Sequence, residues 1–156
     1  MNKKGIFKKV LVLTLVGGMA FWLANFAISR TSFAADYRAA MNISYYPMLL
    51  ESLVGGLVIG LWVSYLLVRF YNRIPFNNPI LKSVLLSSLI LVFVTITLSG
   101  PSSFLTTGNI LRYFILGTSF NVIRITALGI AIGFVCKKQY SAIKPSVVIT
   151  TPAGLE

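Results

Sequence analysis

The sequence predicts an all-α integral membrane protein with four transmembrane helices. The chain is 56% hydrophobic and 11% charged, and its mean hydropathy is +0.84. It contains four apolar stretches, each close to the length of about 20 residues that crosses the hydrocarbon core of a bilayer as a helix. Because the stretches fill most of the chain and short polar segments separate them, we expect one domain built as an up-down bundle.

The four predicted spans cover residues 10–28, 46–68, 80–99 and 113–136. The second and third are joined by residues 73–79, which contain two prolines and two asparagines, residue types that stop one helix and start the next. We expect residues 1–145 to form the transmembrane domain and residues 146–156 to form a disordered cytoplasmic tail.

The basic residues are distributed unevenly among the segments that flank the spans. Cytoplasmic segments of membrane proteins carry an excess of Lys and Arg, so we expect both termini to be cytoplasmic and residues 29–45 and 100–112 to lie outside. An even number of spans agrees with this orientation. The ten basic residues of the expected cytoplasmic segments are Lys3, Lys4, Lys8, Lys9, Arg69, Arg73, Lys82, Lys137, Lys138 and Lys144, and the three of the expected outer loops are Arg30, Arg38 and Arg112.

The first span also fits a cleaved signal peptide. Lysines precede an apolar run, and Ser32-Phe33-Ala34 stands before Ala35 as a small-residue cleavage site would. The apolar run, residues 10–28, is long for the hydrophobic region of a leader, so we favour a retained anchor. Cleavage would leave three spans and place the new N-terminus outside.

The two halves of the chain resemble each other at an offset of 73 residues. Residues 56–60 (Gly-Leu-Val-Ile-Gly) return as residues 129–133 (Gly-Ile-Ala-Ile-Gly), and Lys9 returns as Lys82. Two hairpins in tandem would produce this pattern as a parallel repeat. Chance similarity between membrane segments is the alternative, because such segments use few residue types.

The composition excludes several classes of function. The chain has no His, one Cys and three acidic residues, so it lacks the usual ligands and acid–base pairs of metal hydrolases, haem proteins and two-carboxylate glycosidases. The net charge of +11 follows from the flanks of the spans, and no nucleic-acid-binding motif accompanies it. We therefore expect no enzyme activity, no metal, no cofactor and no nucleic-acid partner.

Small residues form a stripe along one face of the second span. Such residues let helix backbones approach closely, because lipid supplies no hydrophobic drive between helices. We expect this stripe to pack against glycines of the fourth span within one protomer, with a homodimer seam as the alternative. The stripe consists of Ser52, Gly56, Gly60 and Ser64, spaced four apart, and the glycines are Gly129 and Gly133.

Charged and polar residues inside the spans are the candidate functional residues. Glu51 is the only acidic residue inside a predicted span, and Arg124 lies near the middle of the fourth. A charge at that depth costs at least about 2.5–3.5 kcal/mol, so it should have a partner or a water-filled site. We hypothesise that Glu51 pairs with Arg124. Arg112 is the rival partner, and Asn121 and Asn25 complete a polar cluster in the outer half of the bundle.

This cluster has two interpretations. It is either a pocket that is open to the outside and binds a small polar ligand, an ion or a lipid headgroup, or an ion pair that locks the helices together. We expect a small non-enzymatic membrane protein that acts as a subunit, assembly partner or binding module, with the bilayer and a membrane-protein partner or a second copy as its partners. The alternative is a small oligomeric transporter or channel that uses Glu51 and Arg124. An intramembrane enzyme that acts on a lipid is the weakest hypothesis.

Overall fold

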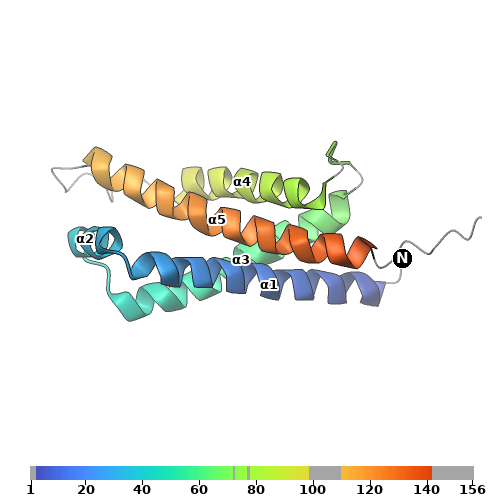
Figure 1. Cartoon of the computed structure of the whole chain (residues 1–156), viewed down its shortest axis with the longest axis horizontal. Coiled ribbons are helices and arrows are strands. Elements are labelled where there is room, and N and C mark those ends of the chain that lie inside the picture. Colours follow the sequence, from blue (N-terminus) through green and yellow to red (C-terminus); the bar gives the residue numbers. More distant parts are fainter. Residues whose placement is uncertain (1–2, 72, 77, 99–109, 142–156) are drawn as a thin grey trace, which may run out of the picture.

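The structure, a computed structural model, describes residues 3–71, 73–76, 78–98 and 110–141. The expected tail, residue 99 of the third predicted span and most of the expected outer loop 100–112 lie outside these residues. The described chain consists of helices and short connections (Figure 1). The helices are α1 (Lys3–Ser29), α2 (Ser32–Ala40), α3 (Tyr45–Phe70), α4 (Pro79–Leu98) and α5 (Ile110–Ser141).

Three of the described helices are long and apolar enough to cross a membrane: Gly5–Ser29, Tyr45–Phe70 and Leu111–Gln139. The apolar stretch described for α4, Pro79–Phe93, is shorter. Large apolar side chains also cover the outside of the bundle, as in Phe93 and Phe134, which are 70% and 62% exposed. Lipid tails solvate such side chains well, whereas water does not. These features support the all-α membrane fold that the sequence predicts.

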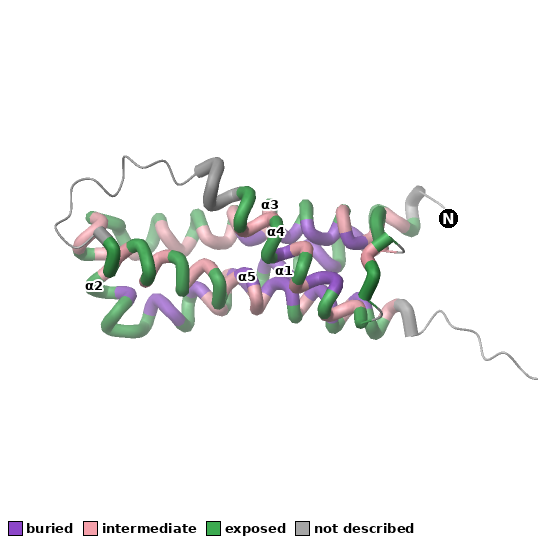
Figure 2. Tube along the Cα trace, turned by 90° about the horizontal axis from the view of Figure 1, so that it is seen from above, coloured by how far each residue is buried: buried purple, intermediate pink, exposed green. Residues whose placement is uncertain are grey.

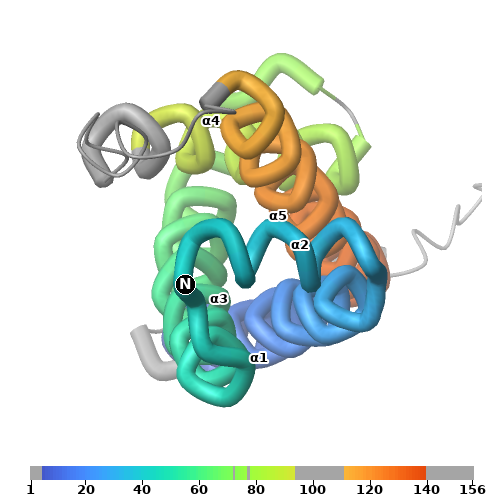
Figure 3. The backbone as a smooth tube through the Cα atoms, turned by 90° about the vertical axis from the view of Figure 1, so that its left-hand side faces the viewer, coloured from blue at the N-terminus to red at the C-terminus, as the bar shows by residue number. Residues whose placement is uncertain are grey.

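The long helices form two neighbouring pairs. Helix α1 packs along both α3 and α5, and α4 packs along α5, whereas α3 makes few contacts with α5 (Figures 1 and 3). The start of α1, the turn between α3 and α4 and the end of α5 lie at one end of the molecule (Figure 1). Helix α2 lies at the opposite end, near the start of α5. The chain therefore runs up and down between the two ends.

The buried core lies where α1, α3 and α5 face one another, with the exposed segments on the outside (Figure 2). Because burial within a lipid-immersed bundle comes from close packing rather than from exclusion of water, small side chains accompany the large ones. The apolar core consists of Leu13 and Phe21 of α1, Val63 and Leu67 of α3, and Ile125, Leu128, Ile132 and Cys136 of α5.

The small-residue stripe of α3 packs against α1. A Cβ added at Gly60 would lie 3.1 Å from the Thr14 carbonyl oxygen, and one added at Gly56 would lie 3.1 Å from the Gly18 carbonyl oxygen. Ser64 is buried on the same helix. Ser52 is half-buried, and its hydroxyl donates to the Leu49 carbonyl at 2.8 Å.

The two glycines of α5 pack against α4 instead of α3. A Cβ at Gly133 would lie 2.5 Å from Ile80 Cα, and one at Gly129 would lie 3.0 Å from Val84 Cα. The expected packing of the α3 stripe on the α5 glycines is therefore wrong. The physical reason is that the stripe of α3 packs on α1 and the glycines of α5 pack on α4, whereas α3 makes few contacts with α5. A homodimer seam stays a prediction.

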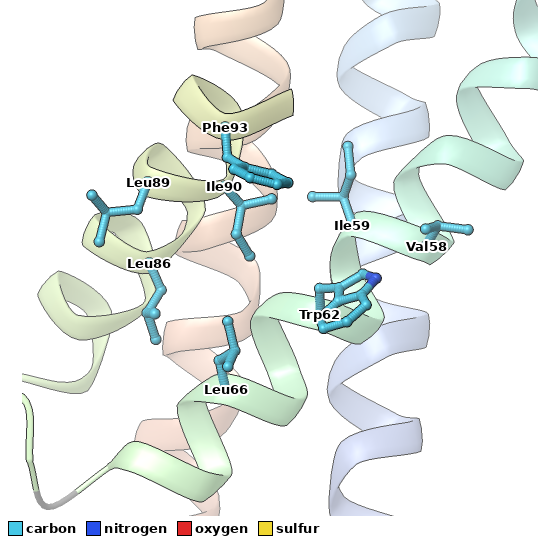
Figure 4. A pocket seen from close by; sticks show the side chains of 8 residues that line it. All are labelled: Val58, Ile59, Trp62, Leu66, Leu86, Leu89, Ile90 and Phe93. Atoms are coloured by element: carbon cyan, nitrogen blue, oxygen red, sulfur yellow. The ribbon is translucent and has the colours of Figure 1, made fainter. Parts of the chain in front are cut away.

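An apolar groove of about 510 Å³ opens between α3 and α4 (Figure 4). It exists because these two helices meet less closely than the other adjacent pairs. Aliphatic and aromatic side chains line it: Val58, Ile59, Trp62 and Leu66 from α3, and Leu86, Leu89, Ile90 and Phe93 from α4.

Helix α2 is an element that the sequence reasoning missed within the expected polar loop 29–45. Thr31 caps its start in extended backbone, and the Thr31 hydroxyl accepts a hydrogen bond from the Ala34 amide at 3.3 Å. A Thr, Ser, Asp or Asn at this position is a known helix-start signal. The helix ends at Ala40, and Asn42 has a φ of 52°, a backbone conformation that Asn tolerates better than most residues.

Candidate functional site

A cavity of about 170 Å³ lies beneath α2, between the end of α1 and the first half of α5. Its lining combines amide, hydroxyl and guanidinium groups with apolar side chains, the composition typical of small-ligand sites. Four elements and one connection supply the lining: Asn25, Ile28 and Ser29 from α1, Ala34, Tyr37 and Arg38 from α2, Ile43, Met48 from α3, and Phe120 and Arg124 from α5.

Asn25 is the most unusual residue of this cavity. It is fully buried, at 0% exposed, on the apolar helix α1. Neither its Oδ1 nor its Nδ2 has a hydrogen-bond partner among the described residues. An unpaired buried amide costs about 1–3 kcal/mol by comparison with protein mutants, so native structures seldom leave one without a reason.

Arg124 brings a positive charge to the same cavity from the middle of α5. Its Nη1 donates to Asn121 Oδ1 one turn earlier at 3.4 Å, while its Nε is buried without a partner. Neither of the two described carboxylates, Asp36 and Glu51, pairs with it in the described part of the chain. A guanidinium has five N–H donors, and most of those of Arg124 are thus available for another acceptor.

Arg38 places a second guanidinium at the cavity wall. Its Nη1 donates to the Ser29 carbonyl at 3.0 Å, and the guanidinium lies over the Tyr45 ring at 5.0 Å from the centroid. These two contacts join α2 to the end of α1 and the start of α3. They fix the position of Arg38 while leaving several of its donors unused.

Tyr37 attaches α2 to α5. Its ring meets Tyr113 and Phe120 edge-on, with centroids 6.3 Å and 5.8 Å away. A Cβ at Gly117 would lie 3.0 Å from the Tyr37 hydroxyl oxygen. The absence of a side chain at Gly117 therefore provides space for the Tyr37 phenol. Burial raises the pKa of Tyr37 above its ordinary value, an effect that the charge of Arg124 partly offsets. The phenol is therefore neutral and able to donate a hydrogen bond near pH 7.

The structure brings together part of the predicted polar cluster. Asn25 and Arg124 line one cavity, and Asn121 bonds to Arg124. The predicted pair of Glu51 with Arg124 is wrong, because Glu51 is exposed on α3. Arg112 is also exposed, in a separate hollow with Phe33, Leu111, Ile115 and Leu116. The reason for the first error is that α3 reaches this cavity through Met48, whereas Glu51 lies on an exposed face of the same helix.

Tyr37 and Arg38 are the site residues that sequence reasoning missed. The signal that could have found them is the helix start at Thr31, because Ala34, Tyr37 and Arg38 then share one helix face at spacings of three and four residues.

A buried charge at the opposite end provides a contrast. Lys82 is 6% exposed, its Nζ donates to the Tyr71 carbonyl at 2.5 Å, and it lies 4.1 Å from the centroid of the Tyr71 ring. These partners satisfy much of its hydrogen-bonding capacity, so Lys82 serves to join α4 to the end of α3. Arg124 has no comparable set of partners.

Among the described residues, no group of three His, Cys, Asp or Glu side chains is placed to hold a metal ion. No protein-family model, curated protein or solved structure matches the chain. The site therefore has to be interpreted from its own chemistry.

Proposed function

We propose that this chain is a non-enzymatic integral membrane protein that acts as a binding module, and that the cavity beneath α2 receives a small polar ligand. The observation that carries the proposal is the fully buried amide of Asn25, which lines the cavity with neither polar atom paired. A ligand that supplied partners for this amide would recover the free energy that its burial costs. The lining holds no acidic side chain or His, which supports binding rather than acid–base catalysis.

In this proposal α4 also crosses the membrane, as the third of four spans. It is 20 residues long, and a helix of that length rises about 30 Å, the thickness of the hydrocarbon core. Retention of α1 as an anchor is supported by its position between α3 and α5, with Leu13 and Phe21 in the core. A cleaved leader would remove these contacts from the folded bundle.

The proposed orientation places both termini in the cytoplasm and the cavity on the outer side. At the end of the molecule with the α3–α4 turn, the described basic residues include Lys8, Lys9, Arg69, Arg73, Lys137 and Lys138, against Arg30, Arg38 and Arg112 at the end with α2. The positive-inside bias then assigns the first end to the cytoplasm.

We also propose that the bundle arose as two tandem hairpins. Thr14 and Ser87, 73 residues apart, each donate a side-chain hydrogen bond to the carbonyl four residues earlier, at 2.8 Å and 2.7 Å. Each of these two residues contacts a glycine of the next long helix in the chain. Gly60 of α3 packs on Thr14, and Gly129 of α5 packs on Ser87. The glycine partners are 69 residues apart, so the second hairpin is shifted by one helical turn relative to the first.

The transporter alternative required Glu51 and Arg124 to share one path. Because Glu51 is exposed on α3 and outside the cavity, that requirement loses its structural support. Binding without transport is the proposal that the cavity favours.

Thermal unfolding of the purified chain in uncharged maltoside micelles tests the binding function. We expect at least one member of a panel of phosphate, acetate, methylammonium, acetamide and phosphatidylglycerol to raise the unfolding midpoint of the wild type saturably. A ligand that binds only the folded state stabilises it by about 2.7 kcal/mol at one hundred times its Kd. Asn25→Leu should abolish the shift. If no member of the panel stabilises the wild type, or if Asn25→Leu responds equally, the cavity is not a binding site.

A further inference from the structure

We infer that the ligand of the cavity beneath α2 carries an anionic oxygen group, a phosphate or a carboxylate, held by Arg124, Arg38 and Asn25. The inference rests on the proposed binding function and adds the chemical class of the ligand. It depends on four observations: the charge of the lining, the unpaired donors, the size of the cavity and the contrast with Lys82.

The charge of the cavity lining is positive and uncompensated. Two guanidinium groups, those of Arg38 and Arg124, border the cavity, and neither of the carboxylates that the structure describes does. The described carboxylates Asp36 and Glu51 are both exposed. A buried charge without an opposite charge is costly where the dielectric constant is low, so an anion in the cavity would be more stable than a neutral or cationic group.

The unpaired donors match an oxyanion. The Nε of Arg124 and the Nδ2 of Asn25 are buried N–H groups without acceptors. Hydrogen bonds from a guanidinium to a phosphate or carboxylate are charge-assisted and about twice as strong as neutral ones. Asn25 Oδ1 is an unpaired acceptor beside them, which favours a ligand that also has a hydroxyl group or a protonated oxygen.

The size of the cavity limits what enters it. Its volume of about 170 Å³ is close to that of an engineered cavity of about 150 Å³ that binds benzene. A phosphate group or a short carboxylate fits this volume, whereas a lipid acyl chain does not. A lipid could therefore place only its headgroup in the cavity, and a free anion could enter whole.

The surroundings of Arg124 differ from those of Lys82, the buried cation at the opposite end of the bundle. Lys82 has its carbonyl acceptor and aromatic face from Tyr71 within the fold and borders none of the cavities described above. Burial of a cation by itself therefore does not create an anion site in this bundle. The site exists where Arg124, Arg38 and Asn25 meet without such partners.

The test measures unfolding midpoints in maltoside micelles, which contain neither charge nor phosphate. One arm titrates inorganic phosphate against chloride of matched ionic strength, and the other adds phosphatidylglycerol against diacylglycerol with the same acyl chains. The first arm detects a free anion and the second a lipid headgroup. We expect a saturable rise of the wild-type midpoint in at least one arm, and the arm that responds identifies the source of the group.

Two variants on α5 provide the matched comparison. Arg124→Gln should weaken binding at least tenfold, because it removes a charge-assisted hydrogen bond. Arg112→Gln removes an exposed charge from the same helix outside the cavity and should bind as the wild type does. Equal binding by Arg124→Gln and wild type, or equal losses in the two variants, would overturn the inference.

Asn25→Asp provides an independent check, since it adds a carboxylate to the wall that Arg124 borders. We expect a higher midpoint than wild type without ligand and no response to phosphate or phosphatidylglycerol. A lower midpoint would show that the cavity disfavours negative charge. Stabilisation of the wild type by methylammonium or acetamide alone would also overturn the anionic class while leaving the binding function intact. If nothing stabilises the wild type, both proposals fail.

Discussion

Asn25 and Lys82 are both buried polar side chains, but they differ in their hydrogen-bond partners. Lys82 finds a carbonyl acceptor at the end of α3, so its burial joins two helices. Asn25 has no hydrogen-bond partner within the described part of the chain, although it is completely buried. Unpaired buried polar groups reduce the stability of the folded state. The proposed binding of a ligand in the cavity explains why a destabilising amide is present at position 25.

Replacing Asn25 with Leu should make the ligand-free protein more stable. The substitution removes an amide without hydrogen bonds and supplies an apolar side chain of similar size, so we expect a gain on the order of 1–3 kcal/mol in the free energy of unfolding. Thermal or denaturant unfolding in micelles measures it. Asn121→Leu is the control and should destabilise, because it removes the acceptor of Arg124 Nη1. A clear loss of stability in Asn25→Leu would mean that the amide has partners in the folded protein.

At the residue scale, the sequence identified part of the polar cluster but not the faces of the helices. Asn25, Asn121 and Arg124 were expected in one cluster, and the structure brings the three to one region. Glu51 was expected to pair with Arg124 but lies on an exposed face of α3. Its face could not be inferred, because α3 carries apolar residues on all sides and lipid-facing and protein-facing positions then have similar composition.

At the scale of the element, glycines determine which helices approach closely. Gly18, Gly56 and Gly60 lie in the contact between α1 and α3, and Gly129 and Gly133 in the contact between α4 and α5. The stripe on α3 was visible in the sequence as a packing face, but its partner was not. The spacing of small residues on a helix indicates that another helix approaches that face closely. It does not indicate which helix that is.

Gly133→Ala should destabilise the contact between α4 and α5. The new Cβ would lie 2.5 Å from Ile80 Cα, a backbone atom that cannot move aside as a side chain would. We expect a loss of about 1–3 kcal/mol in the free energy of unfolding. Gly55→Ala is the matched control, because nothing lies within 4 Å of its added Cβ. It should be neutral or stabilising by up to about 1 kcal/mol through helix propensity. Equal effects of the two substitutions, measured by unfolding in micelles, would argue against the close contact.

Helix α2 shows where sequence reasoning about elements failed. The expectation of a polar loop between residues 29 and 45 followed from its position between two spans. The Thr31 cap and the inward face of Ala34, Tyr37 and Arg38 instead make a short helix that closes the cavity. A nine-residue helix of this kind depends on tertiary contacts for its stability, so its existence is difficult to infer from composition.

At the scale of the whole molecule, the helices divide the bundle into a closely packed side and an open side. The contacts of α1 with α3 and α5, and of α4 with α5, are extensive, whereas α3 and α4 leave an apolar groove between them. The polar cavity lies at the end with α2, and most of the described basic residues lie at the other end (Figure 1). Apolar sides and an uneven distribution of basic residues between the two ends are typical of a membrane-embedded helix bundle.

The most direct test of the proposal that the cavity faces the outside is labelling with a membrane-impermeant maleimide. In a Cys136→Ala background, Ala35→Cys places a thiol on the exposed face of α2, and Phe76→Cys places one in the exposed turn at the opposite end. In intact right-side-out cells or vesicles, we predict labelling of Ala35→Cys and protection of Phe76→Cys until the membrane is permeabilised. Labelling of Phe76→Cys with protection of Ala35→Cys would contradict the orientation and place the cavity on the cytoplasmic side.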